Sequence, residues 1–111
     1  MASLAEQPWE EVYPGVRRRA VGSERMTLTT YRFAPGGRFP RHSHPQEQMV
    51  LVREGSITFT SSTQVVTLRP DHALVIAPDV PHDATAGSEG AVLVSVVSPA
   101  RQSATDYTMV E

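Results

Sequence analysis

The sequence contains no cysteine and no long hydrophobic run. Without cysteine the protein has no disulfides, no thiolate metal sites and no cysteine nucleophile, so any metal ion must be bound by imidazole, carboxylate or amide groups. No apolar segment approaches the length that crosses a bilayer. The N-terminal MASLAEQPWEE has neither the basic region nor the apolar core of a signal peptide. We therefore expect a cytoplasmic protein that makes no membrane contact.

An excess of charge of one sign is also lacking. The formal net charge is -2, and the one basic run, Arg17 to Arg19, is short and is followed by Ala-Val. A solvated strand or turn explains such a run, so we expect no nucleic-acid partner. The hydrophobic content of 40% and the charged content of 20% are those of an ordinary soluble globular protein, and 111 residues suit one domain.

Proline and glycine punctuate the chain at short intervals, and the segments between them are rich in Thr, Val, Ile, Tyr and Phe, which favour strands. The pattern predicts strands at 26–34, 48–53, 56–61, 64–68, 73–77 and 91–98, with one or two more around Val12 and 16–21. Glu54-Gly55 predicts a tight hairpin turn with Gly55 at positive φ, and 61–63 predict a second turn. No segment has a sustained helical apolar period. We therefore predict an all-β fold, a single-domain antiparallel β-sandwich or barrel.

Two of the four histidines lie in HSHPQEQ, which runs from His42 to Gln48. Residues two apart on a strand share a face about 6.5–7 Å from each other, so His42 and His44 point the same way, and Gln48 has the same parity. Two such imidazoles can converge on one ion with bonds of about 2.1 Å. His82 follows two prolines that restrict its backbone, and it is the candidate third imidazole. The alternative for HSH is a polar surface turn, since short motifs also match by chance.

Together these stretches resemble the two motifs of the cupin superfamily. GGRFPRHSHPQEQMVLVREG is similar to the first motif, which has a glycine, an H-x-H pair, a fourth ligand and a closing glycine; here these are Gly36, His42, His44, Gln48 and Gly55. LRPDHALVIAPDVPHDA resembles the second motif, whose P-x-x-P-H pattern falls on Pro78, Pro81 and His82. The resemblance implies a jelly-roll cupin domain over 1–111 with its core at about 9–101. It also implies a bound divalent metal ion and a homodimer, for which the region 9–21 is the candidate contact. Imidazole ligands with an amide oxygen suit zinc, manganese, nickel or iron.

The fourth ligand departs from the pattern of many cupins, which have glutamate where this chain has Gln48. With three imidazoles and an amide every ligand is neutral, so a divalent ion keeps its full charge and is a stronger Lewis acid. Such an ion stabilises a trivalent oxidised state less well. We therefore expect non-redox chemistry, a lyase or isomerase reaction on a small oxygenated molecule such as a hydroxy acid, a keto acid or a sugar acid. The alternatives are an iron-dependent oxygenase and a non-catalytic ligand-binding protein.

The C-terminal stretch VLVSVVSPARQSATDY resembles small cupins that open unsaturated uronate sugars, which typically read D-V-F-S-P-x-R. Ser95 and Val97 replace the aspartate and the phenylalanine, and Arg101 retains the arginine. Arg101 is a candidate to bind a substrate carboxylate, although a surface role is an equal alternative. Tyr31 is a candidate to orient the substrate, against the more common role of core packing. We expect His72 to be exposed and without a function.

Overall fold

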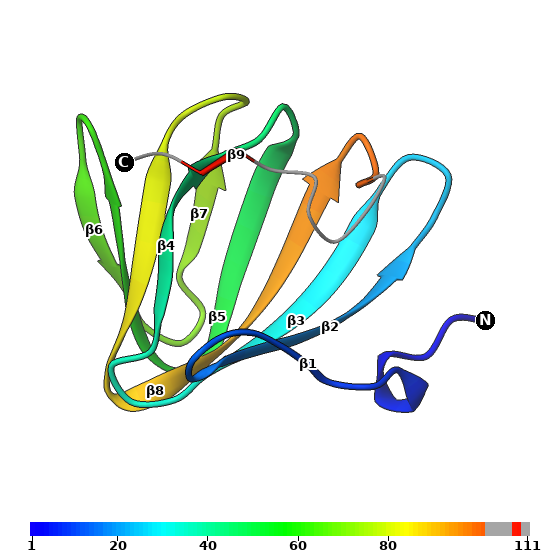
Figure 1. Ribbon diagram of the computed structural model, residues 1–111, viewed down its shortest axis with the longest axis horizontal. Coiled ribbons are helices and arrows are strands. Elements are labelled where there is room, and N and C mark those ends of the chain that lie inside the picture. Colours follow the sequence, from blue (N-terminus) through cyan, green and yellow to red (C-terminus); the bar gives the residue numbers. More distant parts are fainter. Residues whose placement is uncertain (102–107, 110–111) are drawn as a thin grey trace.

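The computed structural model describes residues 1–101 and 108–109 and is almost entirely β-structure (Figure 1). A short 3-10 helix, η1 (Leu4–Glu6), precedes the strands. The strands are β1 (Glu10–Tyr13), β2 (Val16–Gly22), β3 (Thr27–Phe33), β4 (Arg38–Ser43), β5 (Glu47–Ser61), β6 (Val65–Leu68), β7 (Ala73–Ile76), β8 (His82–Ser98) and β9 (Thr108–Met109). Among these residues no helix has the length and apolarity needed to span a membrane. The end of the predicted domain, at 102–107 and 110–111, lies outside the described residues.

The two long strands, β5 and β8, each belong to two sheets. Residues 47–52 pair with 93–98 in one sheet, and 57–61 pair with 82–86 in the other. The first sheet continues through β3, β2 and β1 on one side and β7 on the other, whereas the second continues through β4 and β9 and through β6. All pairings are antiparallel, and the sheets face each other across the bend of β5 and β8, seen at the bottom of Figure 1. This arrangement confirms the predicted antiparallel sandwich.

The bend depends on two glycines. Gly55 and Gly90 both have positive φ, 74° and 75°, and both lie where the β5–β8 register shifts. A Cβ at Gly55 would collide with the carbonyl group of Gly90. The register shift also changes which residues of β5 face inward. The buried residues have even numbers before Gly55 and odd numbers after it.

The predicted hairpin at Glu54-Gly55 is therefore wrong, although the positive φ is correct. The predicted strands 48–53 and 56–61 are one continuous strand that bends through a bulge. In the same way, the predicted strand 91–98 is only the second half of β8. Strand β4 was not predicted as a separate strand because Pro40 interrupts its pattern, but it follows β8 with an irregularity between Phe39 and His42.

The core lies between the two sheets and contains fully buried Val16, Val50, Val52 and Ile57. Alternation along the strands supplies these inward side chains, as in the buried even positions of the first half of β5. The inner face becomes polar at one end of the sandwich. The histidines of the first motif and His82 are buried there rather than exposed to solvent.

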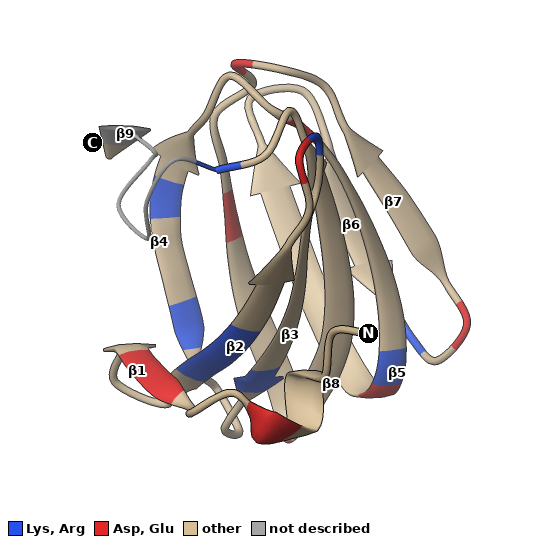
Figure 2. Cartoon of the chain, turned by 90° about the vertical axis from the view of Figure 1, so that its right-hand side faces the viewer, with Lys and Arg blue, Asp and Glu red and all other residues tan. Residues whose placement is uncertain are grey.

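The basic run divides between two faces of β2, which is blue in part in Figure 2. The guanidinium groups of Arg17, Arg19 and Arg32 lie 5.9, 4.3 and 5.5 Å from the centre of the Trp9 ring. Trp9 thus packs against its own sheet through cation–π contacts. Arg18, by contrast, is only 7% exposed and points inward. The run is therefore not a single solvated patch.

Candidate metal centre

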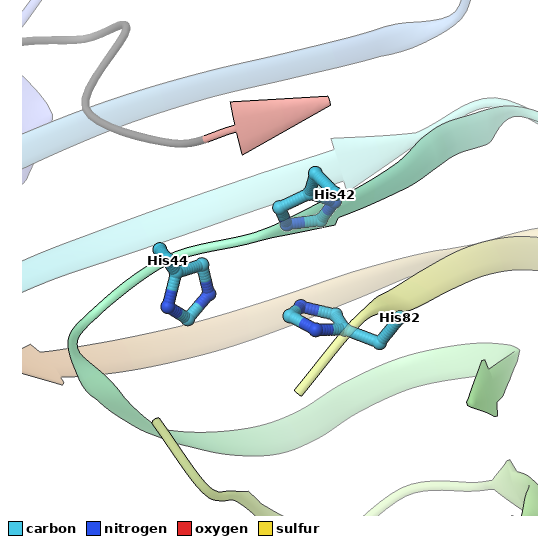
Figure 3. Close-up of side chains that lie close together, drawn as sticks. All are labelled: His42, His44 and His82. Carbon is cyan, nitrogen blue, oxygen red and sulfur yellow. The ribbon is translucent and has the colours of Figure 1, made fainter. Parts of the chain in front are cut away.

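Three imidazoles meet at one end of the sandwich. His42 comes from β4 and lies directly opposite His82 of β8 in the strand register, and His44 lies in the short connection between β4 and β5. The ring centroids are 4.3 Å apart for His42 and His82, 5.1 Å for His44 and His82, and 5.6 Å for His42 and His44. One nitrogen from each ring lies within 4.8 Å of the others, and Figure 3 shows the rings turned toward a common point.

Backbone carbonyl groups fix the orientation of each ring. Nδ1 of His42 lies 2.8 Å from the carbonyl oxygen of Pro40, and Nδ1 of His82 lies 2.8 Å from that of Val80. Nδ1 of His44 lies 3.0 Å from the carbonyl oxygen of Gln46. A carbonyl oxygen only accepts, so each Nδ1 carries the hydrogen, and in a neutral ring the Nε2 lone pair is left for a ligand. This tautomer leaves Nε2 of each ring able to bind a metal ion.

The Gln48 side chain completes the donor set. Its Nε2 donates to the Ser95 hydroxyl oxygen at 2.8 Å, which directs Oε1 the other way, to 3.0 Å from Nε2 of His44. A neutral His44 already uses its one hydrogen on Gln46, so two acceptor atoms face each other across this gap. A second proton on His44, a rotated Gln48 amide or a cation resolves that contact. The chemistry of the donor set therefore fits a metal ion bound by three imidazoles and one amide oxygen.

The histidines resist protonation. Burial lowers the pKa of His42 from 6.5 to about 3, and the neighbouring charge of His82 acts in the same direction. Burial also lowers the pKa of His44 and of His82, although the hydrogen bonds to the carbonyl groups of Gln46 and Val80 oppose it. Neutral imidazole is the form that binds metal, so these shifts keep the three rings ready at neutral pH.

A cavity of about 30 Å³ lies beside the rings of His42 and His82, with room for about two water-sized groups. Tyr31 and Arg101 both line it. Tyr31 is 4% exposed and makes an edge contact with Phe39 at 6.2 Å, so it belongs to the core and to the wall of this cavity. The backbone N–H of Arg101 donates to the hydroxyl of Thr27 at 3.0 Å. Burial of the three histidines is the main cause of their lowered pKa, and the positive charge of Arg101 lowers the pKa of each further.

The structure thus brings all six candidate residues together, namely His42, His44, Gln48, His82, Tyr31 and Arg101. Their convergence does not depend on one continuous strand, since β4 ends at Ser43 and β5 begins at Glu47. His72 is exposed, and its Nδ1 accepts the Arg69 backbone N–H at 3.0 Å in a turn.

Sequence reasoning missed two features of the inner side of the sandwich. The first is the role of Ser95 as the partner of Gln48, a pairing 47 residues apart that no local pattern reveals. The second is the inward direction of Arg18, for which a signal existed. Val16 and Arg18 have the same parity in V-R-R-R-A-V, so a buried Val16 places Arg18 on the inner face as well.

Comparison with known proteins identifies the fold family. The sequence profile of the cupin domain matches residues 29–97. No curated protein sequence matches the chain. Among solved structures, an RmlC-like cupin from Shewanella frigidimarina has a TM-score of 0.82 at 22% identity, over 91% of this chain and 91% of its own. KdgF from a Halomonas species has a TM-score of 0.82 at 23% identity, over 92% and 97%. An oxalate decarboxylase from Lactobacillus farciminis, in its formate complex, has a TM-score of 0.88 at 15% identity, over 98% of this chain and 35% of its own. At such identities the structures share the fold alone, whereas the profile covers more than half of the chain, which therefore belongs to the cupin family.

Proposed function

We propose that the protein is a metal-dependent lyase or isomerase acting on a small oxygenated acid. The observation that carries the proposal is the anchoring of three Nδ1 atoms by backbone carbonyls, which aims the Nε2 lone pairs of His42, His44 and His82 inward. With Oε1 of Gln48 they would hold a divalent ion, for which zinc, manganese, nickel and iron are candidates. When bound, the ion supplies a Lewis acid that polarises an oxygen of the substrate.

The side chains around the cavity support binding and orientation of an acid. The Arg101 guanidinium would bind the substrate carboxylate, since planar guanidinium and carboxylate groups match in a bidentate geometry. The Tyr31 hydroxyl, at the wall of the same cavity, would orient the reacting part of the molecule. Apolar walls formed by Phe39, Phe59 and Leu93 limit access of water on the inner side.

The absence of a carboxylate among the four candidate ligands favours non-redox chemistry. The donors are imidazole and amide groups, and the hydroxyl that holds Gln48 in place is also neutral. No ligand charge would therefore stabilise a trivalent metal, so proton transfer, isomerisation, elimination or hydration is the expected reaction class. The competing iron-dependent oxygenase function would instead need ligand charge that stabilises a trivalent metal.

Metal analysis of protein purified without an affinity tag tests the first step. We expect one divalent ion per chain in the wild type and in a His72→Ala control, and none in His82→Ala. The loaded protein is then screened with uronates and with small hydroxy and keto acids, while oxygen is recorded with an electrode. A product isomeric with the substrate, or formed by elimination or hydration, supports the proposal. Oxygen uptake with an accepted substrate would overturn the non-redox assignment, and tight binding without turnover would overturn the enzyme assignment.

A further inference from the structure

A second cavity adjoins the metal cavity at one side of the sandwich. It is a groove of about 210 Å³ between β6 and β7, and we call it the β6–β7 groove. These consecutive strands belong to different sheets, and among the described strands each pairs with β5 alone (Figure 2). Phe59 and His82 line both the groove and the metal cavity, so the two spaces adjoin at these residues.

Both walls of the β6–β7 groove begin beside residues of the candidate metal centre. On the β6 side, Val66 lies opposite Phe59 in the strand register, and Phe59 lines the metal cavity. On the β7 side, Ile76 lies opposite Gln48, the candidate amide ligand. Exposed Thr63 and Gln64 also line the groove, so it opens to solvent at the β5–β6 turn. The groove therefore connects the metal centre with the outside of the protein.

The metal cavity is too small for a whole substrate. Its volume of about 30 Å³ has room for about two water-sized groups, whereas even lactate has six non-hydrogen atoms. The cavity can thus receive the oxygen atoms that react or bind at the metal, but the rest of a larger acid must extend into an adjoining space. The β6–β7 groove, which adjoins at the candidate ligand His82, offers that space.

The surface of the β6–β7 groove is suited to an apolar group. Apart from His82, the described residues that line it include no acidic or basic side chain, whereas both larger clefts of the molecule are lined by arginine and glutamate. Val66, Leu74 and Val80 are partly buried against the core and line the groove. An apolar group that covers them removes apolar surface from water, whereas a charged group would lose hydration without gaining a partner.

We propose that the β6–β7 groove is the subsite for an apolar side chain of the substrate. This inference rests on the proposed function, because it places the reacting end of the substrate at the metal and its carboxylate at Arg101. The side chain then leaves the metal cavity past His82 and Phe59 and lies against Val66 and Leu74. The substrate class is thereby a hydroxy acid or keto acid with an apolar, branched side chain.

Two matched acids test the subsite. Lactate and 2-hydroxy-4-methylpentanoate have the same hydroxy-acid end, and the second adds three apolar carbons. Calorimetry on the zinc-loaded protein should show that 2-hydroxy-4-methylpentanoate binds about tenfold or more tightly than lactate, because each buried methylene strengthens binding about fourfold. In Val66→Gln this preference should fall at least about fivefold, while the affinities for zinc and lactate stay the same.

A matched variant and a second measurement control for folding. Val65→Gln makes the same change on the outer face of β6, where Val65 is 68% exposed, and should keep the preference. Methyl NMR of the wild type locates the added carbons without any variant. The methyl resonances of Val66 and Leu74 should shift with 2-hydroxy-4-methylpentanoate and stay unchanged with lactate. If Val66→Gln does not fold, these shifts decide, and their absence overturns the subsite.

The outcomes distinguish this inference from the proposed function. If zinc binds but 2-hydroxy-4-methylpentanoate binds no more tightly than lactate, or if the preference survives in Val66→Gln, the subsite is wrong and the metal proposal stands. If zinc does not bind, the metal proposal fails, and methyl NMR of the metal-free protein with 4-methylpentanoate decides the subsite alone. Shifts at Val66 and Leu74 that are kept in Val65→Gln support it, and unchanged resonances overturn it.

Discussion

The Ser95 hydroxyl accepts the Gln48 amide N–H when Oε1 faces the histidines, and Ser95→Ala tests the contribution of this contact to metal binding. In the wild type the amide N–H donates to Ser95 Oγ at 2.8 Å, so Oε1 points to Nε2 of His44. Both residues are buried, Ser95 at 2% and Gln48 at 7% exposure. Removal of the hydroxyl leaves a buried N–H without its acceptor, at a cost of about 1–3 kcal/mol.

The variant can avoid most of this cost by rotating the amide. The N–H then donates to the free lone pair on Nε2 of His44, and the metal-free protein gains a hydrogen bond worth about 1 kcal/mol. Metal binding must reverse that rotation and give up that bond, so the penalty falls mainly on the metal-bound form. A penalty of about 1–2 kcal/mol weakens metal affinity roughly fivefold to thirtyfold. The stability of the metal-free protein should fall by less than the full cost of an unsatisfied donor.

Competition for zinc with a chromophoric chelator near neutral pH measures the affinity. Ser98→Ala is the matched control, because Ser98 is an exposed residue of the same strand whose hydroxyl donates to the Arg25 carbonyl at 3.1 Å. In a Gln48→Glu background the side chain has two equivalent oxygens, so it needs no partner to present an oxygen to the metal. Ser95→Ala should therefore weaken metal binding much less in that background. An affinity of Ser95→Ala within about twofold of the wild type would refute the idea that Ser95 orients the amide.

Three further predictions concern stability and assembly. The pKa of His42 falls from 6.5 in the unfolded chain to about 3 in the folded one, so its neutral form stabilises the fold above about pH 6.5. That stability is lost as the pH falls from 6.5 toward 3, by up to about 1.4 kcal/mol per pH unit. The urea midpoint of the metal-free protein should therefore be lower at the lower of two pH values in this range. In urea denaturation, Gly55→Ala should lower the stability far more than Gly36→Ala. Both glycines have positive φ, but of the two only Gly55 would place its new Cβ against a backbone, that of Gly90. Equal losses of stability would contradict the role of this close approach. The homodimer stays a prediction: light scattering should give about twice the chain mass of 12.1 kDa, and a mass equal to one chain would contradict it.

Local patterns in the sequence were sufficient to select the three histidines that the structure brings together, and to predict most strands. The candidate ligands were selected from the spacing within HSHPQEQ and from the prolines before His82, both of which are short-range features. A glycine at positive φ, in contrast, fits a hairpin turn and a bulge equally well. Only the long-range pairing of Gly55 with Gly90 selects the bulge, and that pairing depends on the whole of β8.

The inward Arg18 shows a different limit. Three consecutive arginines indicate a solvated surface by composition, but a strand sends neighbouring side chains to opposite faces whatever their charge. Val16 is fully buried in the core, and Arg18 is buried as well because it lies on the same face of β2. The strand register thus overrides the composition at this position.

Gln48, which stands where many cupins have glutamate, is physically linked to Ser95, which replaces the aspartate of the resembling uronate cupins. An amide ligand must have an acceptor on its nitrogen side, and a serine hydroxyl supplies that acceptor without adding a charge. The pair therefore leaves the inner site with no negative charge from its four donors, while Arg101 adds a positive one. A divalent ion bound there would keep its charge of two within this donor set. The same neutrality that favours Lewis-acid chemistry thus also favours an anionic substrate.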